Sequence, residues 1–279
     1  MANYTTADIK ALREKTGAGM LDVKKALDEA DGDIEKAIEI IRVKGLKGIA
    51  KREGRSASAG LIAAKVVDGP EGQVGVLIEV NAETDFVAKN EKFLAYAEQV
   101  LAAALVSGAE SVEALTAVEV DGFSVKNLTD SMQAVIGEKI VVRRVARLTA
   151  PRVALYLHHT NPDLPAQVGV LLGTDEAAAD VAHDVAMHIA AYSPQYVARE
   201  DVPAEVVAKE RSIAEETTRA EGKPEKAIPK IVEGRLGAFF KEAVLLDQAF
   251  ARDPKNTVGE IVTATGGSVT GFVRFRVGA

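Results

Sequence analysis

A repeated pentapeptide is the feature that most constrains the fold of this chain. Residues 73–77 read Gln-Val-Gly-Val-Leu, and the same five residues recur at 167–171. Each copy is apolar enough for a buried strand, and each follows another apolar run, at 61–67 and at 153–159, across a polar turn that contains Pro or Gly. The repetition predicts that one strand hairpin is used twice.

Each hairpin leads into a segment with helical periodicity, at residues 90–105 in the first copy and 176–192 in the second. In the first of these helices one face is apolar and carries Phe93, Ala97, Val100, Leu101 and Ala104. Further strands are expected at 140–148 and at 269–277. The pattern predicts an α+β fold with two related antiparallel-sheet-plus-helices subdomains, at 59–149 and at 150–198 with 230–279.

The N-terminal residues 1–46 predict a module of three short helices. Thr5 followed by Asp8 has the spacing of a capping box, and it opens a helix that runs to about residue 15, where Gly17 and Gly19 end it. A second helix spans 20–30 and ends at Asp31-Gly32-Asp33. The third begins there, with apolar residues at helical spacing: Ile34, Ala37, Ile38 and Ile41. A unit this small is more often a binding module than a catalyst.

Two charged segments connect or extend these units. Residues 42–58 are basic, and we interpret 47–58 as a linker, with contact to nucleic acid as the alternative. Residues 203–227 are highly charged and turn at Gly222-Lys223-Pro224. We interpret 199–229 as a protruding helical hairpin, used either for contacts between chains or simply solvated.

Composition removes several classes of protein. The chain has no Cys, which excludes a disulfide framework, thiolate zinc sites and cysteine nucleophiles. Residues 1–10 lack the layout of a signal peptide, and no apolar run approaches the roughly 20 residues that span a bilayer. The net charge of −7 argues against nucleic acid as the ligand of the whole surface. We expect a cytoplasmic protein with no membrane partner and no direct nucleic-acid partner.

No arrangement of residues in the sequence points to catalysis. The phosphate-binding loop Gly-x4-Gly-Lys-Ser/Thr and the nucleophile elbow Gly-x-Ser-x-Gly are both absent. Four histidines are present, at His158, His159, His183 and His188, without the HExxH spacing of a zinc protease. We expect a binding protein that is not an enzyme and needs no cofactor or metal. A metal hydrolase built on His158, His159 and His183 stays open as an alternative.

The tetrapeptide Thr84-Asp85-Phe86-Val87 lies where the strand at 74–80 gives way to the helix from residue 90. One interpretation is local: Thr84 or Asp85 caps a helical turn and Phe86 packs against it as a hydrophobic staple. The other is that Phe86 probes a partner. The second repeat has no aromatic residue at this junction, where it reads Gly173-Thr174-Asp175-Glu176-Ala177. Because the unit can be built without Phe86, the comparison favours a dedicated role for this residue.

Several motifs together give the chain a family resemblance. The first is Leu12-Arg13-Glu14-Lys15-Thr16-Gly17-Ala18-Gly19-Met20. It is followed in order by Glu79-Val80-Asn81, Thr84-Asp85-Phe86-Val87-Ala88-Lys89, Met187-His188-Ile189-Ala190-Ala191, Val232-Glu233-Gly234-Arg235 and Val269-Thr270-Gly271-Phe272-Val273-Arg274-Phe275. In this order the motifs resemble bacterial translation elongation factor Ts, the nucleotide-exchange factor of elongation factor Tu.

The resemblance implies roles for particular residues. The N-terminal module resembles a ubiquitin-associated-like unit that docks on the GTP-binding domain of the partner through Arg13, Met20 and Leu21; the alternative for Met20 and Leu21 is core packing. Thr84, Asp85, Phe86 and Val87 match the element that enters near the nucleotide and dislodges magnesium. His188 matches a contact to the partner's third domain. The charged hairpin resembles a coiled coil through which some members form homodimers.

The function implied is guanine-nucleotide exchange: binding to elongation factor Tu, GDP-bound or nucleotide-free, with GDP release so that GTP can bind. A scaffold or chaperone that binds its partner without exchange is the alternative. Some members continue into a C-terminal helical module, whereas this sequence ends at Ala279. This departure from the pattern of those members puts the contacts of such a module in doubt.

Overall fold

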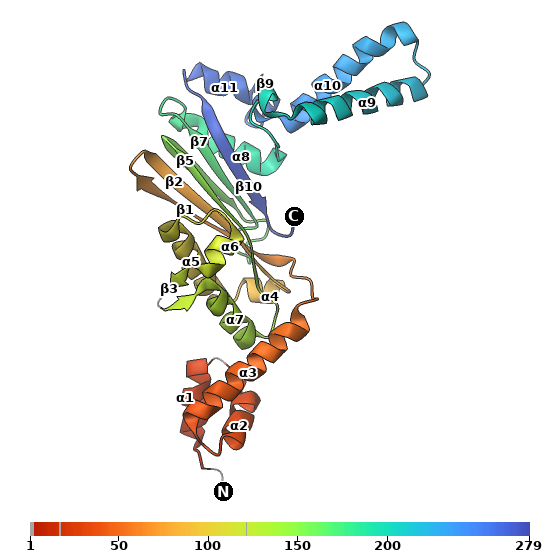
Figure 1. The fold of residues 1–279 in the computed structure, drawn as a ribbon. Coiled ribbons are helices and arrows are strands. Elements are labelled where there is room, and N and C mark those ends of the chain that lie inside the picture. Colours follow the sequence, from red (N-terminus) through yellow and green to blue (C-terminus); the bar gives the residue numbers. More distant parts are fainter. Residues whose placement is uncertain (1–2, 17, 121) are drawn as a thin grey trace.

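The computed structural model describes residues 3–16, 18–120 and 122–279. The molecule is elongated, with three helices at the N-terminal end, two sheets in the middle and a helical hairpin that projects at the other end (Figure 1). The fold is therefore α+β, with N-terminal helices followed by small antiparallel sheets, as the sequence predicts at this level.

The N-terminal module consists of α1 (Thr6–Thr16), α2 (Met20–Glu29) and α3 (Ile34–Arg52). The predicted capping box is present, since the backbone N–H of Thr5 donates to the Asp8 carboxylate at 2.7 Å and the N–H of Asp8 donates to Thr5 Oγ1 at 3.2 Å. The backbone N–H and the hydroxyl of Thr5 both donate to this carboxylate and hold the pKa of Asp8 below its usual value. Gly17, predicted to end the first helix, lies outside the described residues. The core of the module holds Leu12, Ala18, Val23, Ala26, Leu27, Ala30 and Ala37.

Helix α3 is longer than the sequence analysis predicts. It continues to Arg52, so the first half of the segment interpreted as a linker at 47–58 is helical. The C-terminal half of α3 packs on α7 (Val125–Ile136), where a Cβ on Gly45, just before the extension, would lie 2.7 Å from the Cβ of Ala134. The Arg52 guanidinium also donates to the Gln133 carbonyl at 3.1 Å. These long-range contacts stabilise helical turns in a segment whose composition, taken alone, is typical of a polar linker.

The first sheet has the strand order β1-β2-β5 and is antiparallel throughout. Its strands are β1 (Ala59–Gly69), β2 (Gly72–Ala82) and β5 (Val141–Ala150). Three helices pack on it: α5 (Glu91–Ser107), α6 (Val112–Ala117) and α7. A short helix, α4 (Asp85–Ala88), follows β2, and a small hairpin joins β3 (Glu119–Val120) to β4 (Phe123–Ser124).

The second sheet repeats this topology with the order β10-β7-β6. Its strands are β6 (Arg152–His158), β7 (Val168–Thr174) and β10 (Val269–Arg276), and α8 (Ala179–Tyr192) and α11 (Val258–Ala264) cover it. In both sheets the first two strands form a hairpin, and the last strand pairs with the free edge of the hairpin's second strand. Short elements complete this part of the chain: η1 (Arg199–Asp201), η3 (Leu245–Asp247), β8 (Ala249–Phe250) and β9 (Asp253–Thr257).

The repeated pentapeptide forms the contact between the two sheets. A Cβ on Gly75 would lie 2.8 Å from Leu171, and one on Gly169 would lie 2.8 Å from Leu77, so each glycine makes room for the leucine of the other copy. The shared core holds Ile62, Leu77, Ala150, Val153, Leu171 and Phe275. The repeat therefore marks an interface with approximate two-fold character.

The repeated glutamines at 73 and 167 bond across the same interface. Gln73 Oε1 accepts from the backbone N–H of Val153 at 2.9 Å, and Gln167 Nε2 donates to the Gly60 carbonyl at 2.9 Å. Each glutamine thus satisfies a backbone group of the other subdomain.

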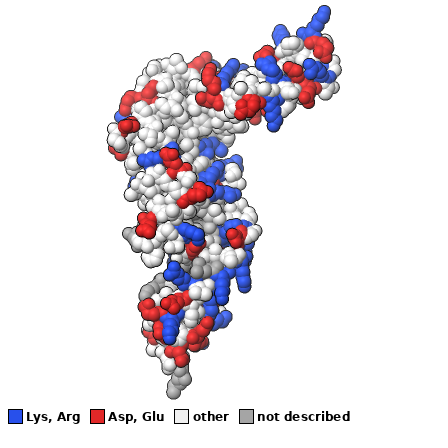
Figure 2. All heavy atoms as spheres, in the orientation of Figure 1, with Lys and Arg blue, Asp and Glu red and all other residues white. Residues whose placement is uncertain are grey.

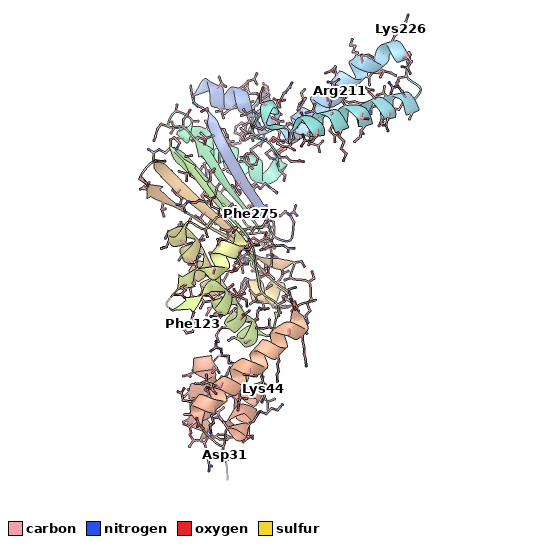
Figure 3. All side chains as sticks on the ribbon, viewed as in Figure 1. Asp31, Lys44, Phe123, Arg211, Lys226 and Phe275 are labelled. Carbon is pink, nitrogen blue, oxygen red and sulfur yellow. The ribbon has the colours of Figure 1, made fainter. Side chains whose placement is uncertain are left out.

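A buried carboxylate ties the first sheet to the end of the chain. Glu79, fully buried on β2, pairs with Arg144 at 2.6 Å and accepts from the backbone N–H of Gly278 at 3.0 Å. The Arg144 guanidinium lies 4.4 Å from the ring centroid of Phe275, which Figure 3 labels near the end of β10. Because the carboxylate is paired and hydrogen-bonded, its burial is tolerated and fixes the register of this corner.

The hairpin is formed by α9 (Ala204–Ala220) and α10 (Ile228–Ala243), with the one-turn helix η2 (Glu225–Ala227) between them. The prediction that it spans 199–229, with the core resuming at 230, is wrong at its C-terminal end, because the second arm continues to Ala243. The apolar residues of the second arm pack against the first arm: Ile228, Val232, Leu236 and Phe240. Their spacing in the sequence would equally suit a helix that covers a sheet.

The outer surface of the hairpin is charged, with both signs mixed along it (Figure 2). Arg211, labelled in Figure 3, pairs with Glu233 of the opposite arm at 2.5 Å. Of the helices in the described part of the chain, none is both long and apolar enough to cross a bilayer.

Candidate functional site

Helix α4 carries the Thr-Asp-Phe-Val motif and exposes its aromatic residue. Thr84 is the N-cap, with extended backbone angles, and its side chain accepts from the N–H of Val87 at 3.4 Å. Val87 and Ala88 are buried in the core of the first subdomain, whereas Phe86 is 79% exposed. The cap interpretation is thus confirmed for Thr84, and the staple interpretation is wrong for Phe86. One side of α4 is therefore buried in the subdomain, and the other side exposes an aromatic side chain, which we call the apolar tip.

Charged side chains lie at and beside helix α4. Lys89 Nζ lies 5.4 Å from the ring centroid of Phe86. The Glu138 carboxylate accepts from the backbone N–H of Thr84 at 3.0 Å and from its hydroxyl at 2.7 Å. Asp85 is exposed beside Phe86. The site therefore consists of a helix held by hydrogen bonds at its N-terminus, with one apolar and one anionic side chain exposed to solvent.

The residues predicted to dock the N-terminal module are also on its surface. Met20 is 60% exposed and Leu21 is 73% exposed, at the start of α2, and Arg13 is exposed on α1. The alternative that Met20 and Leu21 belong to the core is wrong, because the next turn supplies Val23 and Leu27 instead. Met20 and Leu21 together form a small exposed apolar surface at the start of α2.

His188 differs from the other predicted site residues because it is buried, with 1% exposure. Its Nε2 lies 2.8 Å from Gln248 Oε1, and its Nδ1 accepts from the backbone N–H of Ala251 at 3.2 Å. A ring that accepts at Nδ1 carries its proton on Nε2, and burial lowers the pKa of His188. The ring stacks on Tyr192 at 4.6 Å between centroids, and Tyr192 is 55% exposed. His188 thus supports a surface formed by its neighbours, and its contact to the partner stays a prediction.

Of the remaining histidines, His158 and His183 both lie against the ring of Tyr156, at 6.1 and 5.8 Å between ring centroids. His158 Nδ1 lies 3.1 Å from the hydroxyl of Tyr156, and His159 Nδ1 lies 3.0 Å from the Leu164 carbonyl. Within residues 3–16, 18–120 and 122–279, no three His, Asp or Glu side chains gather as a metal-binding group. The arrangement of these side chains gives no support to the alternative of a metal hydrolase.

Comparison with known proteins identifies the family. Residues 83–279 match the family described as Elongation factor TS. The chain is 66% identical to Elongation factor Ts of Beutenbergia cavernae and 63% identical to that of Micrococcus luteus, in each case over the full length of both proteins. It is 62% identical to Elongation factor Ts of Renibacterium salmoninarum, again over both full lengths.

The chain belongs to the elongation factor Ts family. It is a nucleotide-exchange factor for elongation factor Tu, which it binds, and it acts in translation elongation in the cytoplasm. An exchange factor is not a catalytic enzyme. The alternatives of a metal hydrolase and of a scaffold without exchange are thereby removed.

The elongation factor Ts fold spreads the predicted site residues along the molecule rather than bringing them together. Helix α2, with Met20 and Leu21, belongs to the N-terminal module; α4, with Phe86, contacts the first sheet, and α8, with His188, contacts the second (Figure 1). This arrangement suits a large partner touched at several points. It does not suit a small ligand held in one pocket.

Sequence reasoning missed Glu138, which holds the motif helix of this elongation factor Ts. It lies 54 residues from Thr84 in sequence. A carboxylate between a glycine and a lysine has no local signal for such a role, and only the pairing of β2 with β5 brings it to the site.

Proposed function

We propose that this chain accelerates GDP release by placing Phe86 at the magnesium side of the partner's nucleotide site. The observation that carries this proposal is the exposure of Phe86 on a helix whose neighbouring residues, Val87 and Ala88, are buried. A large aromatic on a rigid base gains free energy by entering an apolar pocket and loses little conformational entropy there.

The physics of exchange requires no proton transfer and no covalent step. Magnesium bridges phosphate oxygens and protein ligands in GTPases, so a shift of its ligands weakens nucleotide binding. The exchange factor binds the nucleotide-free partner better than the loaded one. By linkage, the exchange factor lowers the partner's affinity for the nucleotide by the same factor as the nucleotide lowers the partner's affinity for the exchange factor. Asp85, exposed beside Phe86, would contribute by repelling phosphate oxygens or by accepting from a backbone N–H of the partner.

The test is stopped-flow release of fluorescently labelled GDP from purified elongation factor Tu. We expect saturating concentrations of this chain to accelerate release, and excess free magnesium to reduce the acceleration. Binding to elongation factor Tu with an unchanged GDP off-rate would contradict the proposal. Acceleration that does not depend on magnesium would contradict its magnesium part alone.

We also propose that the chain is divided by function. In this division 1–46 docks on the GTP-binding domain of the partner, while the subdomain at 59–149 carries the motif helix. The second subdomain begins at 150 and resumes after the hairpin, because α10 occupies 228–243. The exposed pair Met20 and Leu21 supports the docking role of the first part.

Replacing Met20 and Leu21 together by Ala is expected to weaken affinity for elongation factor Tu by about 30-fold, because well-packed interface residues contribute about 1 kcal/mol each. The maximal rate of GDP release should stay unchanged, since the two residues lie far from the motif helix. Titration by fluorescence separates the two quantities. Val43→Ala, at a residue 50% exposed on α3 of the same module, is the matched control. An unchanged affinity in the double variant would remove the docking assignment.

We propose that the hairpin pairs with a second copy of this chain. Ile213 is 47% exposed beside a hollow of about 180 Å³ that Thr217, Leu236 and Phe239 help to line, so the outer face retains apolar surface. Light scattering at tens of micromolar is expected to show twice the 29.5 kDa chain mass, and Ile213→Lys should return a monomer. A monomeric wild-type chain would contradict the pairing.

A further inference from the structure

Two loops from different parts of the first subdomain exchange hydrogen bonds beside the motif helix. Lys139 donates its backbone N–H to Glu83 Oε1 at 2.6 Å, and Thr84 donates its backbone N–H to Glu138 Oε2 at 3.0 Å. The carboxylate of each loop thus accepts a hydrogen bond from a backbone N–H of the other loop. We call these residues, Glu83, Thr84, Glu138 and Lys139, the clasp.

The clasp orients the hydroxyl that caps α4. Thr84 Oγ1 donates its proton to Glu138 Oε1 at 2.7 Å, which leaves a lone pair to accept from the N–H of Val87 at 3.4 Å. Hydrogen bonds to an ionised carboxylate are stronger than neutral ones, and the Glu83 side chain is only 18% exposed. A four-residue helix such as α4 does not persist without contacts of this kind.

The clasp also holds the connector from the N-terminal module. The Lys139 ammonium donates to the Arg55 carbonyl at 3.0 Å and to the Glu53 carbonyl, and the Arg55 guanidinium pairs with Glu83 at 3.3 Å. Glu53 and Arg55 follow directly on α3. One cluster of side chains therefore joins the helix that presents Phe86 to the segment that leads to the docking module.

We propose that Glu138 is a positioning residue for nucleotide exchange. It fixes the direction in which α4 presents Phe86, and its neighbour Lys139 holds that helix at a set place relative to the docking module. This inference rests on the proposed role of Phe86. Two surfaces that engage one partner simultaneously gain from a connection of fixed geometry, because the second contact then forms at high effective concentration.

The test compares Glu138→Ala and Glu138→Gln with Glu98→Ala, a control at an exposed position of α5. Loss of two bonds to an ionised group is expected to lower the maximal GDP-release rate about tenfold in Glu138→Ala. The affinity for the nucleotide-free partner should change less than the rate. Glu138→Gln retains one of the two acceptor oxygens, so its rate should lie between those of Glu138→Ala and the wild type, and Glu98→Ala should match the wild type.

Hydrogen exchange supplies a readout that does not depend on activity. The amides of Thr84 and Val87 should exchange faster in Glu138→Ala, while the amides of β2 should keep their protection. If Glu138→Ala does not fold, Thr84→Val takes its place; it removes the hydroxyl bond to Glu138 and should lower the rate and the protection of Val87.

The inference can fail separately from the proposed function. If the wild type accelerates release and depends on Phe86, but a folded Glu138→Ala (or its substitute) is as fast as the wild type, the clasp does not position the helix. Equal losses of rate in the Ala and Gln variants with unchanged amide exchange would also overturn it. If Phe86 itself proves dispensable, the proposed function fails first.

Discussion

Replacing Phe86 by Ala is expected to slow elongation-factor-Ts-stimulated GDP release by about 100-fold, the size of effect found for an aromatic residue at the centre of an interface. The side chain is 79% exposed in the free chain, so its removal should leave the free energy of unfolding almost unchanged. The effect should therefore appear in exchange kinetics and not in stability.

The measurement is stopped-flow release of labelled GDP at saturating exchange factor, with thermal unfolding of the variant alongside. Val106→Ala is a suitable control, because Val106 is 91% exposed on a different helix. Phe86→Leu keeps an apolar body without the ring and should fall between the two. Wild-type release rates in Phe86→Ala would show that the tip of α4 does not drive exchange.

Leu171→Ala is expected to lower the free energy of unfolding by about 2–5 kcal/mol, since it deletes a fully buried side chain and leaves a cavity. Leu171 lies between the sheets, in the space that Gly75 leaves open. Its counterpart Leu77 occupies the space opened by Gly169, so Leu77→Ala should cost a similar amount. In both variants the two subdomains should unfold in a single transition.

Urea unfolding followed by circular dichroism and by hydrogen exchange of each sheet tests this expectation. Val106→Ala is again the control, with a change within about 0.5 kcal/mol. A loss below about 1 kcal/mol in Leu171→Ala, or unfolding of the second sheet alone, would mean that the sheets do not share a core.

The elements that could be predicted are those whose signals are local. Thr5 and Asp8 predict a cap because the two residues bond each other, and no distant residue is needed. The strands at 61–67 and 74–80 follow from a continuous apolar run broken by a turn. The repeat predicts two copies of one unit, because the same residues in the same order fold under the same local constraints.

The errors lie where distant contacts decide. Helix α3 extends past the predicted module, and Arg52 in this extension bonds to α7. The predicted second arm of the hairpin is too short because a row of apolar residues does not reveal which element it packs against. The burial of His188 beside Gln248 also depends on distant contacts, and its predicted contact to the partner stays a prediction.

The candidate site divides in the same way. The two repeated sheets and the motif with an aromatic residue at the junction can be read from the sequence, which leaves Thr84 and Asp85 as alternative caps. The tertiary structure shows that Thr84 is the cap, that Phe86 points to solvent while Val87 and Ala88 are buried, and that Glu138 accepts a hydrogen bond from Thr84. The physical reason is range: caps, turns and strand patterns depend on residues a few positions apart. Exposure and the partners of a carboxylate depend on which distant strands pair, and here the pairing of β2 with β5 decides both.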